Sequence, residues 1–245
     1  MKIVPFMLTI IAGLSTLIGF LVTYTQTNEN KVIKYSLSFA SGVMVCVSIY
    51  ELIPESIKLL SKSLNKCELF LYLFFSILIG CIVPYIIDKK ISRNSNDLYK
   101  LGILSMIAII VHNIPEGIIT YLSASKSLNL GITMTIAIAF HNVPEGISIA
   151  VPIYYANKSR GRAFLYTFLS GMSEPLGAII SHILLNKIIN DTILGIILTI
   201  TSAVMTTISI NSLLSKALEY QEKIKTIIFF IIGIAMMIIS IKIIK

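Results

Sequence analysis

The chain has 245 residues, of which 56% are hydrophobic and only 13% are charged, and its mean hydropathy is +0.87. Soluble domains carry about 25% charged residues, so this composition argues against a soluble enzyme, a disordered protein and a nucleic-acid-binding protein. The net charge of +8 does not change this conclusion, because the cations are spread over short connecting segments without a basic, aromatic-rich cluster. Three cysteines without a CxxC pair predict neither a disulfide framework nor a cysteine metal site.

Eight apolar stretches are long enough to cross a bilayer, which requires about 20 residues of helix. They cover residues 3–25, 35–57, 67–88, 99–123, 129–154, 163–186, 192–215 and 224–244. The longest polar connection, residues 88–100, is too short to fold alone. The first stretch is long for the apolar part of a signal peptide and lacks an A-x-A-like cleavage site, so we expect it to be retained. The sequence therefore predicts an all-α integral membrane protein in which residues 1–245 form a single transmembrane domain.

The distribution of positive charge predicts the orientation. With the N-terminus outside, 12 of the 20 lysines and arginines fall on the inner side, including all three arginines, Arg93, Arg160 and Arg162. Cytoplasmic loops carry an excess of lysine and arginine. We therefore predict a multi-pass protein of the cytoplasmic (inner) membrane with both termini outside.

Two copies of one short motif lie near the middle of the fourth and fifth stretches. The first copy reads HNIPEGI from His112 to Ile118, and the second reads HNVPEGI from His141 to Ile147. Two of the three histidines in the chain thus occupy the same place in the two copies, 29 residues apart. This offset is about one helix plus a turn, so the copies are expected on consecutive, oppositely directed helices near the bilayer midplane.

The spacing within each copy places three donor groups on one side of a helix. At about 100° per residue, Glu116 projects about 40° from His112, between the imidazole and the amide of Asn113. The second copy repeats the arrangement with His141, Asn142 and Glu145. Imidazole, amide oxygen and carboxylate suit divalent first-row metals and suit Cu(I) poorly. Two such faces turned toward each other would form a metal-binding cage.

Proline and further carboxylates accompany these motifs. Pro115 and Pro144 cannot donate a backbone hydrogen bond, so we expect them to bend or break their helices and expose backbone oxygens near the midplane. The sixth stretch adds Glu174 beside a proline, near mid-span. The second stretch adds Glu51 and Glu55, which we expect toward the external face, on an entry path for the metal.

Two other polar residues have simpler interpretations. A single intramembrane carboxylate costs roughly 3 kcal/mol to insert, so polar residues inside spans need a role or a partner. His182 has no partner in the sequence and is interpreted as a packing or interfacial residue. Asn211 is interpreted as a residue that forms a hydrogen bond between helices.

The doubled motif, followed by Glu174-Pro175, resembles the ZIP (Zrt-, Irt-like) family of divalent-metal transporters, in particular its bacterial zinc-uptake, ZupT-like branch. The resemblance covers nearly the whole chain, including the opening MKIVPFMLTIIAGLSTLIG. It implies eight helices in a 3+2+3 arrangement, with the outer triplets related by inverted pseudosymmetry, and both termini outside. Two departures concern cytoplasmic metal handling: residues 88–100 contain no histidine, and the seventh stretch has Asn211 where relatives often carry an acidic residue.

The resemblance also implies a two-metal site between the fourth and fifth spans. One metal would be held by His112, Glu116, His141 and Glu145. The other would be held by Asn113, Glu116, Asn142, Glu145 and Glu174. The helical wheel independently makes Glu116 and Glu145 the shared residues.

These observations predict an importer of Zn²⁺ that also accepts Fe²⁺, Mn²⁺, Co²⁺ and Cd²⁺, and not an enzyme. We expect no cofactor other than the transported metal at one or two sites. The expected partners are divalent metal ions and membrane lipid, with no nucleic acid, and a homodimer is left open. The alternative is a carrier of an organic solute in which the Glu and His pairs form a proton relay. A membrane-bound metal hydrolase is disfavoured, because the chain lacks HExxH and an evident nucleophile.

Overall fold

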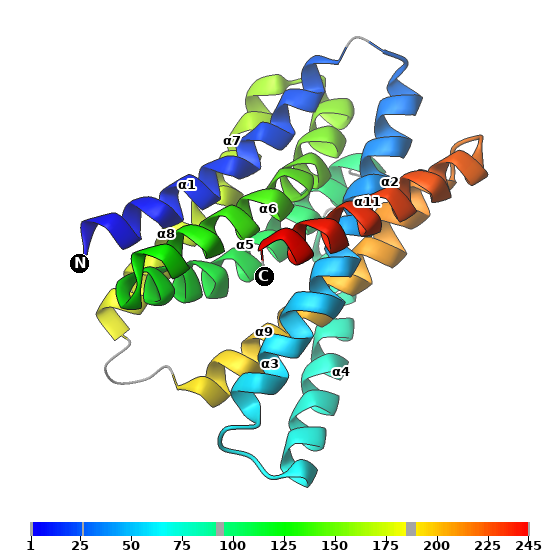
Figure 1. The fold of residues 1–245 in the computed structure, drawn as a ribbon. Helices are drawn as coiled ribbons and strands as arrows, with labels where there is room; N and C mark the ends of the chain where they lie inside the picture. Colours follow the sequence, from blue (N-terminus) through cyan, green and yellow to red (C-terminus); the bar gives the residue numbers. More distant parts are fainter. Residues whose placement is uncertain (1, 26, 92–95, 185–189, 245) are drawn as a thin grey trace.

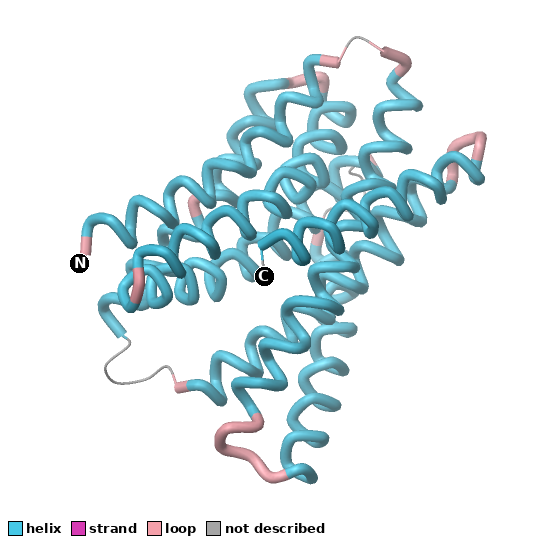
Figure 2. The backbone as a smooth tube through the Cα atoms, viewed as in Figure 1, coloured by secondary structure: helices cyan, strands magenta, loops and turns pink. Residues whose placement is uncertain are grey.

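The computed structural model describes residues 2–25, 27–91, 96–184 and 190–244, and these ranges contain helices and no strand (Figures 1 and 2). Eight helical segments within them are long and apolar enough to cross a membrane. They run Ile3–Tyr24, Glu29–Leu60, Lys66–Lys90, Asp97–Lys126, Leu128–Asn157, Arg160–Ile183, Asp191–Leu218 and Lys223–Ile243. The prediction of an all-α membrane protein with eight spans is therefore confirmed.

Four of the spans are built from more than one helical element. The elements are α1 (Ile3–Phe20), η1 (Leu21–Tyr24), α2 (Glu29–Val47), η2 (Ser48–Leu52), α3 (Ile53–Leu60), α4 (Lys66–Lys90), α5 (Asp97–Lys126), α6 (Leu128–Asn157), α7 (Arg160–Gly171), α8 (Ser173–Leu184), α9 (Asp191–Ile208), η3 (Ser209–Leu214), α10 (Ser215–Leu218) and α11 (Lys223–Ile244). Two of the inserted elements, η2 and η3, are π-helical turns.

Asparagine fixes where several helices begin. The side chains of Asn28, Asn65, Asn96 and Asn190 each accept a hydrogen bond from a backbone N–H in the first turn of the helix that follows. At α4 the cap is reciprocal, because the carboxylate of Glu68 also accepts from the backbone N–H of Asn65 at 2.9 Å. Such caps satisfy N–H groups that have no partner within the helix. The short polar connections therefore set the limits of the long apolar helices.

The spans pack as two groups of helices (Figure 1). In the first group α1 packs along α6, and α5 packs against α6 and α8. In the second group α2 packs along α11, and α9 packs against α3 and α4. The groups meet chiefly where α2 lies against α6 and α5 lies against α9. The predicted 3+2+3 arrangement with inverted pseudosymmetry stays a prediction.

The prolines of the two motifs do not break their helices, which corrects the break expected from the sequence, whereas the expected bend stays a prediction. Helix α5 continues through Pro115, and α6 continues through Pro144. Neighbouring helices and small local adjustments allow membrane helices to tolerate proline. The irregular backbone lies instead in η2, in η3 and at Met172, where α7 ends before α8 begins.

Ion pairs gather at the end of the bundle where α2 and α11 begin. The carboxylate of Glu222 accepts from Lys34 at 2.6 Å, from Lys225 at 2.5 Å and from the Tyr35 hydroxyl at 2.9 Å. The hydrogen bonds from Lys225, Lys34 and Tyr35 lower the pKa of Glu222 to about 2. Lys34, which precedes the predicted second stretch, is a buried residue of α2.

Two further ion pairs at this end join the two helix groups. Lys158, which follows α6, lies 2.6 Å from Glu29 in α2, and Lys216 of α10 lies 3.7 Å from Asp97 in α5. Arg93, Lys187 and Lys245, which also entered the charge count, lie outside the described residues.

The motif glycines bring helix backbones into direct contact. A Cβ atom on Gly146 would overlap the backbone carbonyl of Thr16 in α1, and a Cβ on Gly117 would overlap that of Glu174 in α8. Small residues permit this close approach in membrane helices. The positions of α1 and α8 against α6 and α5 therefore depend on these two glycines.

We predict that Gly146→Ala lowers the free energy of unfolding by about 1–3 kcal/mol, because α1 must move away from α6 to admit the methyl group. Gly161→Ala is the matched control, since the nearest atom to a Cβ there is the Ser159 hydroxyl at 4.0 Å. Thermal unfolding of both variants in detergent measures the difference. Equal midpoints for Gly146→Ala and the wild type would contradict the packing argument.

Candidate metal site

The two sequence motifs meet in the interior, because α5 and α6 pack against each other along their lengths. The side chains of His112, Asn113, His141, Asn142 and Glu145 are completely buried. Glu116 is 5% exposed, and Glu174 of α8 is completely buried beside them. All seven predicted site residues therefore lie in the protein interior, at the middle of their spans.

Glu116 lies between the two histidines. Its Oε1 atom is 3.1 Å from Nε2 of His141 and 3.2 Å from Nε2 of His112. Nε2 of His112 is also 3.4 Å from Oε1 of Glu145. One ligand atom from each of His112, Glu116 and His141 lies within 4.8 Å of the other two. A single divalent cation fits among donors at this spacing.

The asparagines are fixed by their amide nitrogens. Nδ2 of Asn113 donates to the backbone carbonyl of Ser170 at 3.2 Å. Nδ2 of Asn142 donates to the backbone carbonyl of Ala12 at 2.8 Å and to Oε1 of Glu174. With each amide nitrogen engaged, each amide oxygen is left as the available donor to a cation.

Several buried oxygens in this cluster accept no hydrogen bond from any residue that the structure describes. They are Oδ1 of Asn113, Oδ1 of Asn142, Oε2 of Glu116, both carboxylate oxygens of Glu145 and Oε2 of Glu174. Leaving a buried polar group without a partner costs about 1–3 kcal/mol. A bound cation would satisfy these oxygens together, and that is the chemistry for which the donor set is suited.

The interruption between α7 and α8 places Glu174. Helix α8 begins at Ser173, so Glu174 lies in its first turn, where the helix dipole favours a negative charge. The Ser173 hydroxyl donates to the carbonyl of Ser170 at 2.5 Å and holds the turn in place. A straight helix through this segment would not offer an N-terminus at the level of the site.

A cavity of about 510 Å³ extends from the site toward the end of the bundle where α3 ends, lined by Glu116, Glu51, Glu55 and Lys58 among others. Glu55 lies on its exposed side and pairs with Lys58 at 3.1 Å. Glu51 lies deeper than the sequence suggested, because its Oε2 atom is 3.9 Å from Nδ1 of His141. The π-helical turn η2 shifts the helix register around Glu51, which an ideal helical wheel does not represent.

The two remaining predicted residues lie away from the cluster. His182 does have a partner, since its Nδ1 atom is 3.3 Å from the Tyr121 hydroxyl. Asn211 donates to the Tyr85 hydroxyl at 3.3 Å, so the predicted hydrogen bond between helices is confirmed.

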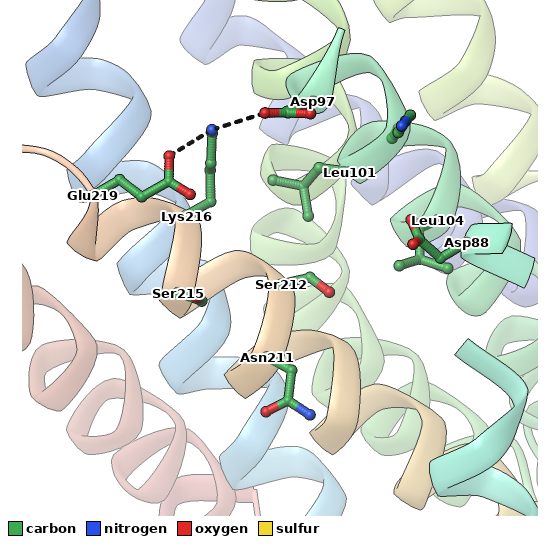
Figure 3. A pocket seen from close by; sticks show the side chains of 10 residues that line it. Asp88, Asp97, Leu101, Leu104, Asn211, Ser212, Ser215, Lys216 and Glu219 are labelled. Atoms are coloured by element: carbon green, nitrogen blue, oxygen red, sulfur yellow. Dashed lines mark hydrogen bonds and ion pairs between the residues drawn. The ribbon is translucent and has the colours of Figure 1, made fainter. Parts of the chain in front are cut away.

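A separate polar pocket of about 240 Å³ lies at the opposite end from the large cavity, between α5 and the η3–α10 segment (Figure 3). The ammonium group of Lys216 lies in it between two carboxylates, 2.6 Å from Glu219 and 3.7 Å from Asp97. Lys216 thus pairs with both carboxylates. Asn211 lines this pocket, but none of the seven predicted metal-site residues does.

Sequence reasoning missed the backbone groups that orient the asparagines. The carbonyls of Ala12 and Ser170 hold the amides of Asn142 and Asn113. Both carbonyls stand beside glycines, Gly13 and Gly171, whose backbones touch each other. The recurrence of glycine and other small residues in these stretches indicates close helix contact and could have pointed to these backbone groups.

A buried cluster of donors that could hold a cation lies midway along eight membrane spans and is reached by a cavity from one end, an arrangement that fits a membrane transporter of cations. Comparison with known proteins agrees: the family model described as ZIP Zinc transporter matches residues 2–97 and 90–241. The chain belongs to this family, which is a family of transporters and not of enzymes.

Individual relatives match along almost the whole chain. The zinc transporter ZupT of Streptococcus mutans is 39% identical, covering 96% of this chain and 95% of its own length. The zinc transporter ZupT of Chlorobium luteolum is 40% identical over the same shares. That of Oceanobacillus iheyensis is 36% identical over 97% of each chain.

We predict that Glu116→Ala weakens Zn²⁺ binding to the purified protein by at least tenfold, because this carboxylate contacts both imidazoles. Isothermal titration calorimetry in detergent measures the change. Asn211→Ala, in which a distant hydrogen bond is lost, serves as the control and should bind as the wild type does. Equal Zn²⁺ affinity in Glu116→Ala and the control would remove Glu116 from the site.

Proposed function

We propose that this chain imports Zn²⁺ across the cytoplasmic membrane and also accepts Fe²⁺, Mn²⁺, Co²⁺ and Cd²⁺. The observation that carries the proposal is the doubled motif on α5 and α6, whose His and Glu side chains converge in the buried interior. Membership of the ZIP zinc transporter family and the zinc-transporting relatives support the same cargo. The proton-relay carrier has no support from these relatives.

The proposed site holds one or two metal ions. His112, Glu116, His141 and Glu145 would hold the first, and Asn113, Asn142 and Glu174 would complete the second, with Glu116 and Glu145 shared. Two cations that share carboxylates are each held less tightly than in a closed structural site. Transport requires such weak binding, because the ion must leave as well as enter.

The proposed direction is inward from the end that carries the termini. Supporting this, the cavity lined by Glu51, Glu55 and Glu116 opens toward that end, while ion pairs such as Lys158–Glu29 join the helix groups at the opposite end. The positive-charge count places the opposite end in the cytoplasm. Both termini would then be outside, and the structure would represent a form open to the exterior.

We predict that Glu145→Ala abolishes ⁶⁵Zn²⁺ uptake into proteoliposomes while the protein still folds and inserts. Its carboxylate lies 3.4 Å from His112 and has no hydrogen-bond partner among the described residues, so it is available to both proposed metals. Cys67→Ser, at an exposed position of α4, should retain uptake. Uptake near the wild-type rate in Glu145→Ala would refute the cage.

We also predict that His112→Ala and His141→Ala lower the ratio of Zn²⁺ to Mn²⁺ uptake, because zinc gains more from nitrogen ligands than manganese does. Asn113→Ala and Asn142→Ala should instead affect Mn²⁺ and Fe²⁺ more, since they remove oxygen donors. Parallel uptake of the three ions by the four variants measures both effects. Equal losses for every ion would contradict this division of roles.

A further inference from the structure

The two histidines that are equivalent in the sequence have different surroundings. His112 directs Nε2 toward Glu116 and Glu145, and its Nδ1 atom has no hydrogen-bond partner among the described residues. His141 directs Nε2 toward Glu116 at 3.1 Å, and its opposite ring nitrogen, Nδ1, faces the carboxylate of Glu51 at 3.9 Å. One imidazole therefore lies between two carboxylates on opposite sides of its ring, and the other does not.

We propose that Glu51 is a positioning residue for His141, a role that rests on His141 being a metal ligand as proposed above. A metal-bound histidine usually donates its second ring N–H to a carboxylate, carbonyl or water, which fixes the tautomer and the ring orientation and makes the ligand more basic. Glu51 supplies that carboxylate. It keeps the proton on Nδ1 and the lone pair of Nε2 directed at the metal.

The separation of 3.9 Å is longer than a hydrogen bond, so in this structure the Glu51 carboxylate faces the Nδ1 side of the imidazole without a direct hydrogen bond. Hydrogen bonds of functional groups are often long without substrate and shorten in the complex. When a cation withdraws electron density through Nε2, the Nδ1 proton becomes more acidic and its attraction to Glu51 increases. Metal binding therefore shortens this contact.

The backbone holds Glu51 where this contact requires it. Glu51 lies in the π-helical turn η2, between the buried residues Ser48 and Leu52. The Ser202 hydroxyl of α9 donates to the carbonyl of Ser48 at 3.0 Å and anchors the start of the turn. Glu51 thus belongs to the helix group of α2 and α9, whereas His141 belongs to the other group. The metal affinity of His141 consequently depends on how closely the two groups approach at this level.

An entry-path carboxylate would act differently. Glu51 and Glu55 line the same cavity, but only Glu51 lies beside an imidazole. If Glu51 acted only through its charge on the path, its removal would weaken uptake by the same factor whether or not His141 is present. A positioning residue instead loses its effect when His141 is absent.

The test is a double-variant cycle on purified protein, with Zn²⁺ affinity measured by calorimetry and ⁶⁵Zn²⁺ uptake measured in proteoliposomes. Loss of such a positioning partner typically costs about 10–100-fold in metal affinity, so we expect Glu51→Gln to weaken Zn²⁺ binding by that factor. In the His141→Ala background Glu51→Gln should cause no further loss. In the His112→Ala background it should cause the full loss, and Glu55→Gln should cause equal fold-changes with and without His141.

Three controls keep the result interpretable. Thermal unfolding identifies a variant that has not folded, and Glu51→Asp, which keeps the carboxylate, should restore part of the affinity that glutamine loses. The visible spectrum of bound Co²⁺ reports ligand geometry directly, and it should change in Glu51→Gln in the same direction as in His141→Ala. An unchanged Co²⁺ spectrum in Glu51→Gln would overturn the positioning role.

The outcomes separate this inference from the proposed function. Wild-type Zn²⁺ affinity in His141→Ala would show that His141 is not a metal ligand, and the proposed ligand set would then be wrong. A clear loss in His141→Ala, with Glu51→Gln adding its full effect on top, would leave the site intact and overturn only the role of Glu51. Wild-type affinity in Glu51→Gln would also overturn that role.

Discussion

Ionisable side chains buried at the centre of an apolar helix bundle are the constraint on which the rest of this structure depends. Glu116 is tolerable there because two imidazoles lie within 3.2 Å of its Oε1 atom. Without such partners each buried charge would be strongly unfavourable. The mutual stabilisation is incomplete, since both oxygens of Glu145 accept no hydrogen bond within the described part of the chain. The site thus keeps buried oxygens without hydrogen-bond donors, and these oxygens are available to a cation that enters and leaves.

The surrounding helices serve to hold these groups in place. Gly146 allows α1 to touch α6, and this contact brings the carbonyl of Ala12 to the amide of Asn142. Gly117 allows α8 to touch α5, and the interruption at Met172 then presents Glu174 from a helix N-terminus. An extra methyl group at Gly146 would displace α1, and one at Gly117 would displace α8. Either shift would move groups that contact the candidate site.

The repeat of the motif does not make the site symmetric. Its two copies lie on oppositely directed helices, but within the described ranges only the second imidazole is approached by a carboxylate from the other helix group. The two ends of the bundle also differ. A cavity reaches the site from the end near Glu55, whereas the Lys158–Glu29 pair and the Lys216 contact with Asp97 (Figure 3) connect the two helix groups at the other end. The doubled motif therefore lies in a site whose two sides differ.

The sequence by itself determined the class of protein, the eight spans and the candidate donor residues, because hydrophobic length and the doubled motif are local properties that need no knowledge of packing. The seven candidate site residues could be identified because polar and ionisable groups are rarely placed inside membrane spans without a functional role. Only the tertiary structure decided that α5 and α6 pass through Pro115 and Pro144 without a break, and that Glu51 lies beside His141. Membrane helices tolerate proline with the help of their neighbours, and a π-helical turn anchored by Ser202 sets the register of Glu51. Neither feature can therefore be read from the periodicity of a single segment.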